Sequence, residues 1–275
     1  MTQSHTPTRR STILLGSIRL WVPTTRYLNS RWTSGNRWIR WLVFSRTNEY
    51  CKTSRLYLMP IAFSQTTTAL NSGGSATTHN FSANGLGSVT AVTDGIAFVL
   101  YDSGGTGINP TSVTWGGVAM AMAGSVNQTT RGNTQSLWYL FNPASGAVTI
   151  SDTFAAANTP NMIWAVYSWV SNNSIVNIAT GSTTVSNNLT VTVNTLYGDS
   201  WLVGAFTNNL GVGVAGANTT SRFSNVLAIG DTNASIQSMW PQSQSWSLAS
   251  STNWTGIVCA ITTPKQKGNN LILFS

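Results

Sequence analysis

From residue 60 onward, short runs of β-branched and aromatic residues alternate with clusters of Gly, Asn, Ser and Pro. The runs recur about every 8 to 12 residues, which is the spacing of short strands joined by turns in all-β domains. The lack of Lys/Glu-rich heptads excludes a coiled coil, and the lack of an internal repeat of fixed period means that neither a propeller nor a solenoid is favoured. The pattern therefore favours an antiparallel β fold.

Two hairpins are predicted, one over residues 112–122 and one over residues 136–154. In the first, Gly116 and Gly117 supply the positive φ angles that a tight two-residue turn requires. In the second, Pro143 lies in a polar loop and ends the first strand, because proline cannot donate to a strand ladder. Each hairpin is expected to pair within one sheet.

Other strands differ in how many faces they bury. Residues 162–170 are apolar on both faces, which predicts a central strand covered twice. Leu189, Val191 and Val193 alternate with polar residues, which predicts a strand with one face in water. Further strands are expected over residues 62–68, 75–82, 96–101, 174–180, 201–206, 221–229 and 255–262. Together they predict an antiparallel two-sheet β-sandwich of jelly-roll or immunoglobulin-like topology.

Charge is distributed unevenly along the chain. Residues 1–60 contain ten basic residues and one acid, whereas residues 61–275 contain four basic residues and five aspartates. The composition changes at Met59, so we divide the chain into an irregular, basic Arg/Trp-rich leader (1–58), a β-sandwich domain (59–264) and a C-terminal tail (265–275). The main domain gives no reason to expect nucleic acid, and no apolar run after residue 60 approaches the roughly 18 residues that a membrane span needs.

The leader has three interpretations. It could be a basic arm that contacts nucleic acid, or a transit-like targeting peptide without acids before Glu49. The third and favoured interpretation is an over-extended reading frame whose true start is Met59. We therefore expect the leader to add nothing to the fold.

Groups for acid–base chemistry are scarce after residue 60, and they consist of Asp94, Asp102, Asp152, Asp199, Asp231 and His79. Four of them, Asp94, Asp102, Asp199 and Asp231, lie beside Gly or Ser in turn contexts, where aspartate side chains usually bond backbone amides. Three alternatives stay open: a glycosidase carboxylate pair, a catalytic triad through His79, and calcium loops over residues 102–109 or 231–235. Cys51 and Cys259 have no zinc spacing. We predict no enzyme activity, catalytic residue, cofactor or metal site.

Tryptophans give a stronger signal. Those inside strong strand runs are expected in the core, namely Trp138, Trp164, Trp169 and Trp201. Trp240, Trp246 and Trp254 instead punctuate a polar stretch. Core or subunit packing is the favoured interpretation for these three, and stacking on a host-surface glycan or a protein partner is the alternative.

Four segments resemble a known family: residues 112–120, with their Trp-Gly-Gly turn, residues 137–146, residues 198–203 and the closing strand 254–264. They are similar to the Thr/Asn-rich β-sandwich proteins encoded by tailed phages and by bacterial and archaeal surface-protein genes. The resemblance covers residues 61–264 and implies a sandwich fold with a structural or adhesive role. It implies no catalytic residues.

These observations predict a non-enzymatic structural subunit of a virion, such as a tail, fibre or head-decoration protein. We expect a homo-oligomer that also contacts other virion proteins, because residues 137–141 and 162–170 are apolar on both faces. In the tail, Leu271, Ile272, Leu273 and Phe274 are suited to strand pairing with a sheet edge of the same or another subunit. The alternative is an extracellular or cell-surface adhesin or carbohydrate-binding module.

Overall fold

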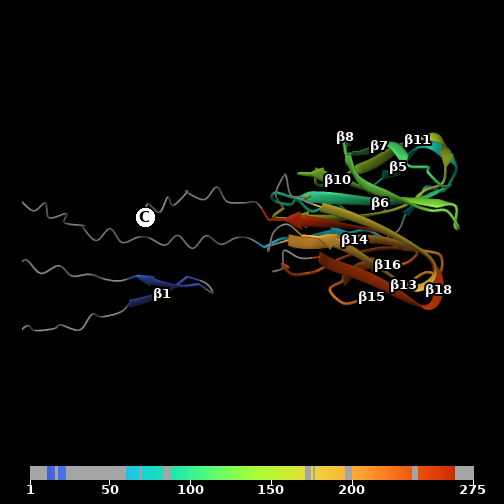
Figure 1. Cartoon of the computed structure of the whole chain (residues 1–275). Coiled ribbons are helices and arrows are strands. Elements are labelled where there is room, and N and C mark those ends of the chain that lie inside the picture. The colour runs from blue at the N-terminus through green and yellow to red at the C-terminus, as the bar shows by residue number, and fades with distance from the viewer. Residues whose placement is uncertain are drawn as a thin grey trace, which may run out of the picture. The chain divides into compact units, whose positions relative to one another are not determined.

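The computed structural model describes residues 11–15, 18–22, 60–68, 70–82, 88–170, 175, 177–195, 200–236 and 241–263. Every regular element in these segments is a β-strand, and every strand pairing is antiparallel. The antiparallel all-β sandwich expected from the sequence is confirmed (Figure 1). The same segments contain no helix able to span a membrane.

The chain divides into two compact units, Met1–Ser54 and Arg55–Ser275. The first contains one antiparallel hairpin, formed by β1 (Ser11–Leu15) and β2 (Ile18–Val22). The leader was expected to be irregular, so this hairpin is a regular element that the sequence pattern did not predict. Whether a chain starting at Met59 folds without the leader stays a prediction.

The second unit contains three sheets, whereas the sequence predicted two. The central sheet has the strand order β3-β12-β6-β10-β9, and β4 also pairs with β12. Its strands are β3 (Ala62–Thr66), β4 (Leu70–Asn71), β6 (Ile96–Gly104), β9 (Ala121–Gln128), β10 (Asn133–Phe141) and β12 (Asn161–Ser168). The four-stranded sheet has the order β5-β11-β7-β8. Its strands are β5 (Ala76–Ser82), β7 (Pro110–Trp115), β8 (Val118–Ala119) and β11 (Thr149–Asn158).

The third sheet, called the long-strand sheet, has the order β13-β18-β14-β17-β16, and β15 also pairs with β18. Its strands are β13 (Asn177–Asn194), β14 (Ser200–Asn208), β15 (Val214–Ala215), β16 (Thr220–Ser224), β17 (Leu227–Asp231) and β18 (Pro241–Thr262). Residues 221–229, expected as one strand, therefore form the β16–β17 hairpin instead.

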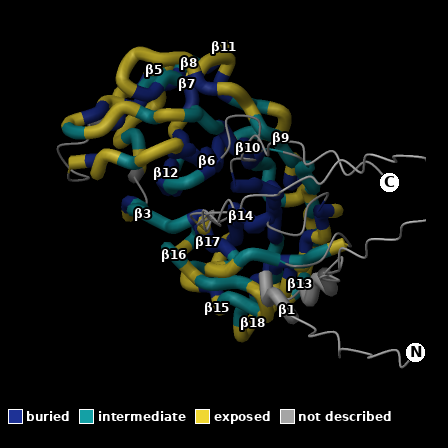
Figure 2. Tube along the Cα trace, turned by 90° about the vertical axis from the view of Figure 1, so that its left-hand side faces the viewer, coloured by how far each residue is buried: buried dark blue, intermediate teal, exposed yellow. Residues whose placement is uncertain are grey.

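The central sheet lies between the other two, as the order of labels in Figures 1 and 2 shows. Along β6, alternate side chains point to opposite faces, so Val99 packs with residues of the four-stranded sheet and Phe98 with residues of the long-strand sheet. We call these contacts the first interface and the second interface. Strands β6 and β12 are buried on both faces, which confirms the doubly covered central strand predicted over residues 162–170, although the strand ends at Ser168.

This arrangement removes one argument for oligomers. Strands apolar on both faces were expected to need loops or neighbouring subunits to cover them. In the structure, a sheet of the same chain covers each face instead. Any assembly of this protein therefore has to use other surfaces.

The first predicted hairpin is confirmed at its turn. Gly116 and Gly117 have φ angles of 58° and 82°, and Trp115 pairs with Val118 across them. The strand after the turn is divided, however, because β8 ends at Ala119 and β9 joins the central sheet. Met120 lies at this transfer, and its backbone N–H donates to Val113 O at 2.9 Å.

The second predicted hairpin is wrong. Strand β10 pairs with β6 and β9 in the central sheet, whereas β11 pairs with β5 and β7 in the four-stranded sheet. The loop containing Pro143 crosses between sheets rather than reversing within one. Sequence periodicity identified both strands, but it carries no information on which strands pair.

Strands β13 and β18 form one long antiparallel ladder that folds back over the outer face of its own sheet. Their pairing shifts between Thr183 and Asn188. A Cβ placed on Gly181 would lie 3.1 Å from Cγ2 of Val191, although the two residues are ten apart on one strand. The predicted alternation of Leu189, Val191 and Val193 is confirmed, because these side chains are buried between the folded-back segment and the sheet while their neighbours are exposed.

Candidate functional site

The structure places the predicted tryptophans mainly in the interior. Trp246 and Trp254 are fully buried, so neither presents a ring face to a glycan, and the core interpretation is confirmed for both. Trp240 and the tail residues Leu271–Phe274 lie outside the described residues. Trp138, Trp164 and Trp201 are core residues as expected. Trp169 is the exception: it lies beyond the end of β12 with a φ of 61° and is only half-buried.

Trp246 and Trp254 support a loop. Strand β14 ends at Asn208, and the chain then passes over the two indoles, so that a Cβ on Gly213 would lie 3.3 Å from each ring. The buried Asn208 side chain fixes this loop. Its Oδ1 accepts from the backbone N–H groups of Leu210 (2.8 Å) and Gly211 (2.9 Å), and its Nδ2 donates to Gly211 O (2.9 Å). At its other end, Gly213 O accepts from Ser224 Oγ at 2.8 Å and Val214 pairs with Ser247, so the loop backbone is anchored at both ends.

The apolar side chains of this segment point outward. Leu210, Val212 and Val214 are 56%, 68% and 66% exposed, which is high for large aliphatic residues. We call residues 210–214 the apolar loop. A fixed loop that keeps three aliphatic side chains in water is typical of a contact surface.

The structure places three of the aspartates in strands rather than in turns. Asp94 is exposed in a turn with a φ of 44°, as predicted. Asp102, Asp152 and Asp231 instead lie within strands and are buried, and each is paired with a cationic or imidazole side chain. Asp152 was not assigned to a turn, so the turn prediction is wrong for Asp102 alone. It holds in part for Asp231, whose Oδ1 also accepts from the backbone N–H of Asn233 at 2.8 Å. Asp199 lies outside the described residues.

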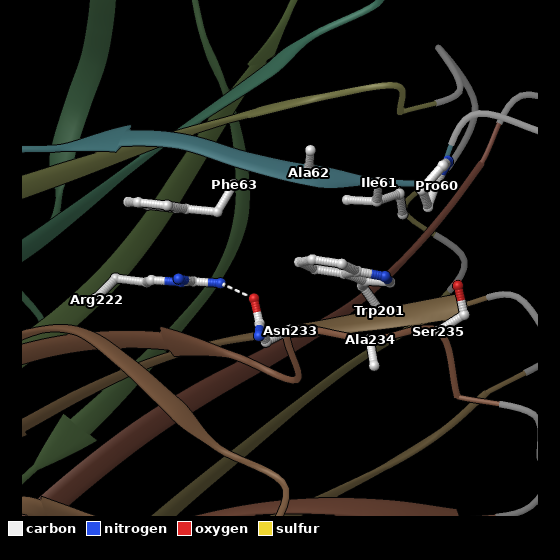
Figure 3. Close-up of a pocket in the computed structure, with 9 residues that line it drawn as sticks. All are labelled: Pro60, Ile61, Ala62, Phe63, Trp201, Arg222, Asn233, Ala234 and Ser235. Carbon is white, nitrogen blue, oxygen red and sulfur yellow. Dashed lines mark hydrogen bonds between the residues drawn. The ribbon is translucent and has the colours of Figure 1, made fainter.

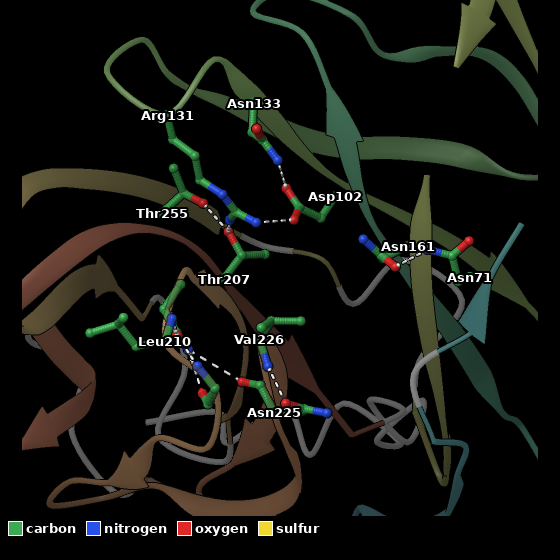
Figure 4. A network of polar contacts seen from close by, with 12 residues as sticks. Asn71, Asp102, Arg131, Asn133, Asn161, Thr207, Leu210, Asn225, Val226 and Thr255 are labelled. Carbon is green, nitrogen blue, oxygen red and sulfur yellow. Dashed lines mark hydrogen bonds and ion pairs between the residues drawn. The ribbon is translucent and has the colours of Figure 1, made fainter. Parts of the chain in front are cut away.

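Asp102 belongs to a polar network at one end of the second interface (Figure 4). Its Oδ2 accepts from Arg131 Nη2 at 2.8 Å, and its Oδ1 accepts from Asn133 Nδ2 at 3.1 Å. Arg131 Nη1 also reaches Thr207 Oγ1 of the long-strand sheet at 3.5 Å. Burial raises the pKa of Asp102, while the charge of Arg131 and the hydrogen bonds of Asn133 and Arg131 oppose this rise.

The His79–Asp152 pair lies in the first interface. His79 Nδ1 is 2.7 Å from Asp152 Oδ1, and His79 Nε2 is 3.0 Å from Asn158 O. A carbonyl oxygen only accepts, so Nε2 carries a proton and donates it. Both ring nitrogens are therefore occupied, which leaves none to activate a serine as a triad requires. Burial raises the pKa of Tyr101 well above its ordinary value, and the nearby Asp152 charge raises it further.

Arg222 and Asp231 form a bidentate pair between β16 and β17. Nε donates to Oδ2 at 2.7 Å, and Nη2 donates to Oδ1 at 2.9 Å and to Asn233 Oδ1 at 2.6 Å. The β16–β17 register shifts between Ser221 and Phe223, so Arg222 is the extra residue of a bulge. The bulge directs the guanidinium towards the central sheet, where it lies 4.3 Å from the centroid of Phe63.

A pocket of about 370 Å³ opens beside this cation–π contact (Figure 3). It is lined by Pro60, Ile61, Ala62, Phe63, Trp201, Arg222, Asn233, Ala234 and Ser235. Trp201 is only 4% exposed, and its indole Nε1 has no hydrogen-bond partner among the described residues. The pocket thus combines apolar walls with a buried donor that lacks an acceptor.

These sites do not support the chemical alternatives raised by the sequence. The three buried carboxylates lie on strands of three different sheets, and each is bound to its own cationic or imidazole partner. The oxygens that calcium would need in Asp102 and Asp231 instead accept hydrogen bonds from Arg131 and Asn133 and from Arg222. No group of three His, Cys, Asp or Glu side chains placed to hold a metal occurs within the described segments.

The pocket and the apolar loop were missed by the sequence analysis. One sequence signal did point to buried ion pairs. Arg131 and Arg222 are the only Lys or Arg residues between positions 61 and 263, and each pairs with a buried aspartate. Neither the pocket nor the apolar loop has a sequence motif by which it could be recognised. Comparisons with protein-family models, with curated proteins and with solved structures find no match for the chain.

Proposed function

We propose that the protein is a non-enzymatic structural subunit of a virion, such as a tail, fibre or head-decoration protein. It acts by self-assembly and display on the particle surface. The observation that carries this proposal is the apolar loop, whose fixed backbone keeps Leu210, Val212 and Val214 in water. A preformed loop loses little conformational entropy on docking, so most of its apolar burial contributes to binding.

The charged groups support the same proposal. Asp102, Asp152 and Asp231 are used inside the fold to neutralise side chains and link neighbouring strands or sheets. The outward residues of β13, such as Thr190 and Thr192, are neutral and hydrogen-bonding rather than charged. Neutral polar faces with few charges suit a subunit packed among copies of itself, because no charge has to be desolvated at a contact.

Assembly is tested by sedimentation velocity over a wide concentration range. We expect the full chain to self-associate, and a Leu210→Ser/Val212→Ser variant to weaken association at least about tenfold, which corresponds to about 1.4 kcal/mol. Val118→Ser is the matched control, because Val118 is 54% exposed on the four-stranded sheet, outside the apolar loop. The control should associate like the unchanged chain.

Location is tested on purified particles from the native source. Antibodies against the chain should label the particles, and the chain should remain bound after washing in high salt. A chain that stays monomeric at every concentration and is absent from particles would contradict the proposal. Glycan binding by such a monomer would favour the adhesin alternative instead.

A further inference from the structure

The side of the molecule that carries the pocket has two unpaired sheet edges. Strand β3 is the last strand of the central sheet, and β16 is the last strand of the long-strand sheet. Within the described residues, neither has a strand on its outer side. The two edges meet through the Phe63–Arg222 contact, so a row of free backbone groups borders each side of the pocket. We call this region the seam.

The seam contains an unsatisfied donor. Trp201 comes from β14, and its Nε1–H is buried without an acceptor among the described residues. A buried N–H without a partner is costly and rare in native proteins. In Figure 3 the indole nitrogen lies at the end of the pocket bordered by Pro60 and Ser235. A carbonyl oxygen entering at that end would satisfy the indole donor.

The described chain leaves the fold beside the same strand. Ser200 pairs with Thr262 and Trp201 pairs with Ile261, so Thr263 lies next to the start of β14. Seven residues then separate Thr263 from Leu271. At about 3.3–3.6 Å per residue they can extend about 25 Å, which is ample to return to a pocket lined by Trp201. The segment Leu271–Phe274 is continuously apolar.

We propose that residues Leu271–Phe274 of the same chain dock in the seam, with an apolar side chain in the pocket and a backbone carbonyl accepting from Trp201 Nε1. The tether favours this occupant, because linking a segment to its site by a short linker gives a millimolar effective concentration. Backbone pairing with an exposed edge supplies the remaining contacts, as in other cases of strand addition. The inference concerns a different surface from the apolar loop and does not depend on the proposed function.

The first test compares the full chain with a chain ending at Asn270. Hydrogen exchange measured by mass spectrometry should be faster in the shortened chain at β3 and β16 and unchanged at β6. With 15N-labelled tryptophan, the indole resonance assigned by a Trp201→Phe variant should shift on shortening. Identical exchange and spectra in the two chains would overturn the proposal.

The second test supplies the segment separately. A labelled peptide of residues 264–275 should bind the shortened chain saturably in fluorescence anisotropy and should not bind the full chain. Ala234→Phe, which adds bulk at an exposed wall of the pocket, should abolish binding. Ala217→Phe, at an exposed residue outside the pocket lining, should not. Protection of β3 and β16 that appears only in concentration-dependent oligomers would assign the site to a second copy's tail and overturn the same-chain proposal.

Discussion

The two interfaces of the central sheet bury the same kind of acid but neutralise it differently. In the first interface, Asp152 lies against the imidazole ring of His79, with Nδ1 of the ring 2.7 Å from Oδ1 of the carboxylate. In the second interface, Asp102 and Asp231 lie against arginines, which stay charged at every pH at which the protein folds. Among the three ion pairs of the described residues, only the pair in the first interface lacks a guanidinium group.

The comparison extends to the tyrosines of the central sheet. Tyr101 lies near Asp152 in the first interface, and Tyr167 lies near Asp231 in the second. Burial raises both pKa values well above the ordinary value, and each aspartate raises its neighbour's pKa further. In the second interface the Arg222 charge partly offsets this effect. The same acid–tyrosine arrangement is therefore paired with a guanidinium group on one side of the sheet and with an imidazole ring on the other.

The largest expected effect comes from removing the tryptophan contact in the first interface. Trp164 meets Trp115 edge to face, with ring centroids 5.5 Å apart. Trp164→Ala should lower the free energy of unfolding by about 3–5 kcal/mol, because it removes buried area and leaves a cavity. Urea unfolding followed by circular dichroism measures the loss.

Ile163→Ala is the matching change on the opposite face of β12, and it should cost about 2–5 kcal/mol. Because β12 serves both interfaces, each variant should keep one unfolding transition. Two transitions in the Trp164→Ala variant alone would show that the four-stranded sheet unfolds by itself.

The next prediction compares the stability that each of the two arginine–aspartate pairs contributes. Arg222 contacts Asp231 through two parallel hydrogen bonds, whereas Arg131 contacts Asp102 through one. A lysine keeps the charge but cannot form the fork. Arg222→Lys should therefore cost about 1–2 kcal/mol and Arg131→Lys less than about 1 kcal/mol, since both guanidinium groups retain some contact with water. Equal losses in thermal unfolding would show that fork geometry adds nothing at this site.

A smaller effect concerns pH in the first interface. Burial raises the pKa of Asp152 above its ordinary value of 3.8, against the opposing effects of His79. Between 3.8 and the raised value, the folded chain holds a proton that the unfolded chain has released, so the stability contributed by this carboxyl increases as pH falls through that window. Asp152→Asn removes the titration.

The comparison is made by measuring unfolding of both chains from pH 7 to pH 4. The difference in unfolding free energy should move in favour of the unchanged chain as pH falls. A difference that stays constant, or that moves in favour of the variant, would contradict the raised pKa.

Structural features that depend on neighbouring residues could be predicted from the sequence, whereas those that depend on residues far apart in the chain could not. The Gly116-Gly117 turn and the alternation from Leu189 to Val193 follow from local backbone and burial preferences, and both were predicted correctly. The pairing of β10 and β11 with different sheets was not, because strand partners are chosen by contacts far apart in sequence. The buried pairs were missed for the same reason. Asp102 and Arg131 are 29 residues apart, and His79 and Asp152 are 73 apart.

The smallest perturbation uses thiols to ask whether the two interfaces open together. Cys259 is fully buried in the second interface, and burial raises the pKa of its thiol to about 12, so almost no thiolate forms while the fold is intact. In a Cys51→Ser background, Cys259 should react with a thiol reagent only at the rate of unfolding.

Ala97 is equally buried in the first interface, and an Ala97→Cys variant lacking Cys51 and Cys259 supplies the matching probe. Equal rates would mean that the central sheet couples the two interfaces into one cooperative unit, as its doubly buried strands predict. Faster labelling at position 97 would mean that the four-stranded sheet separates first.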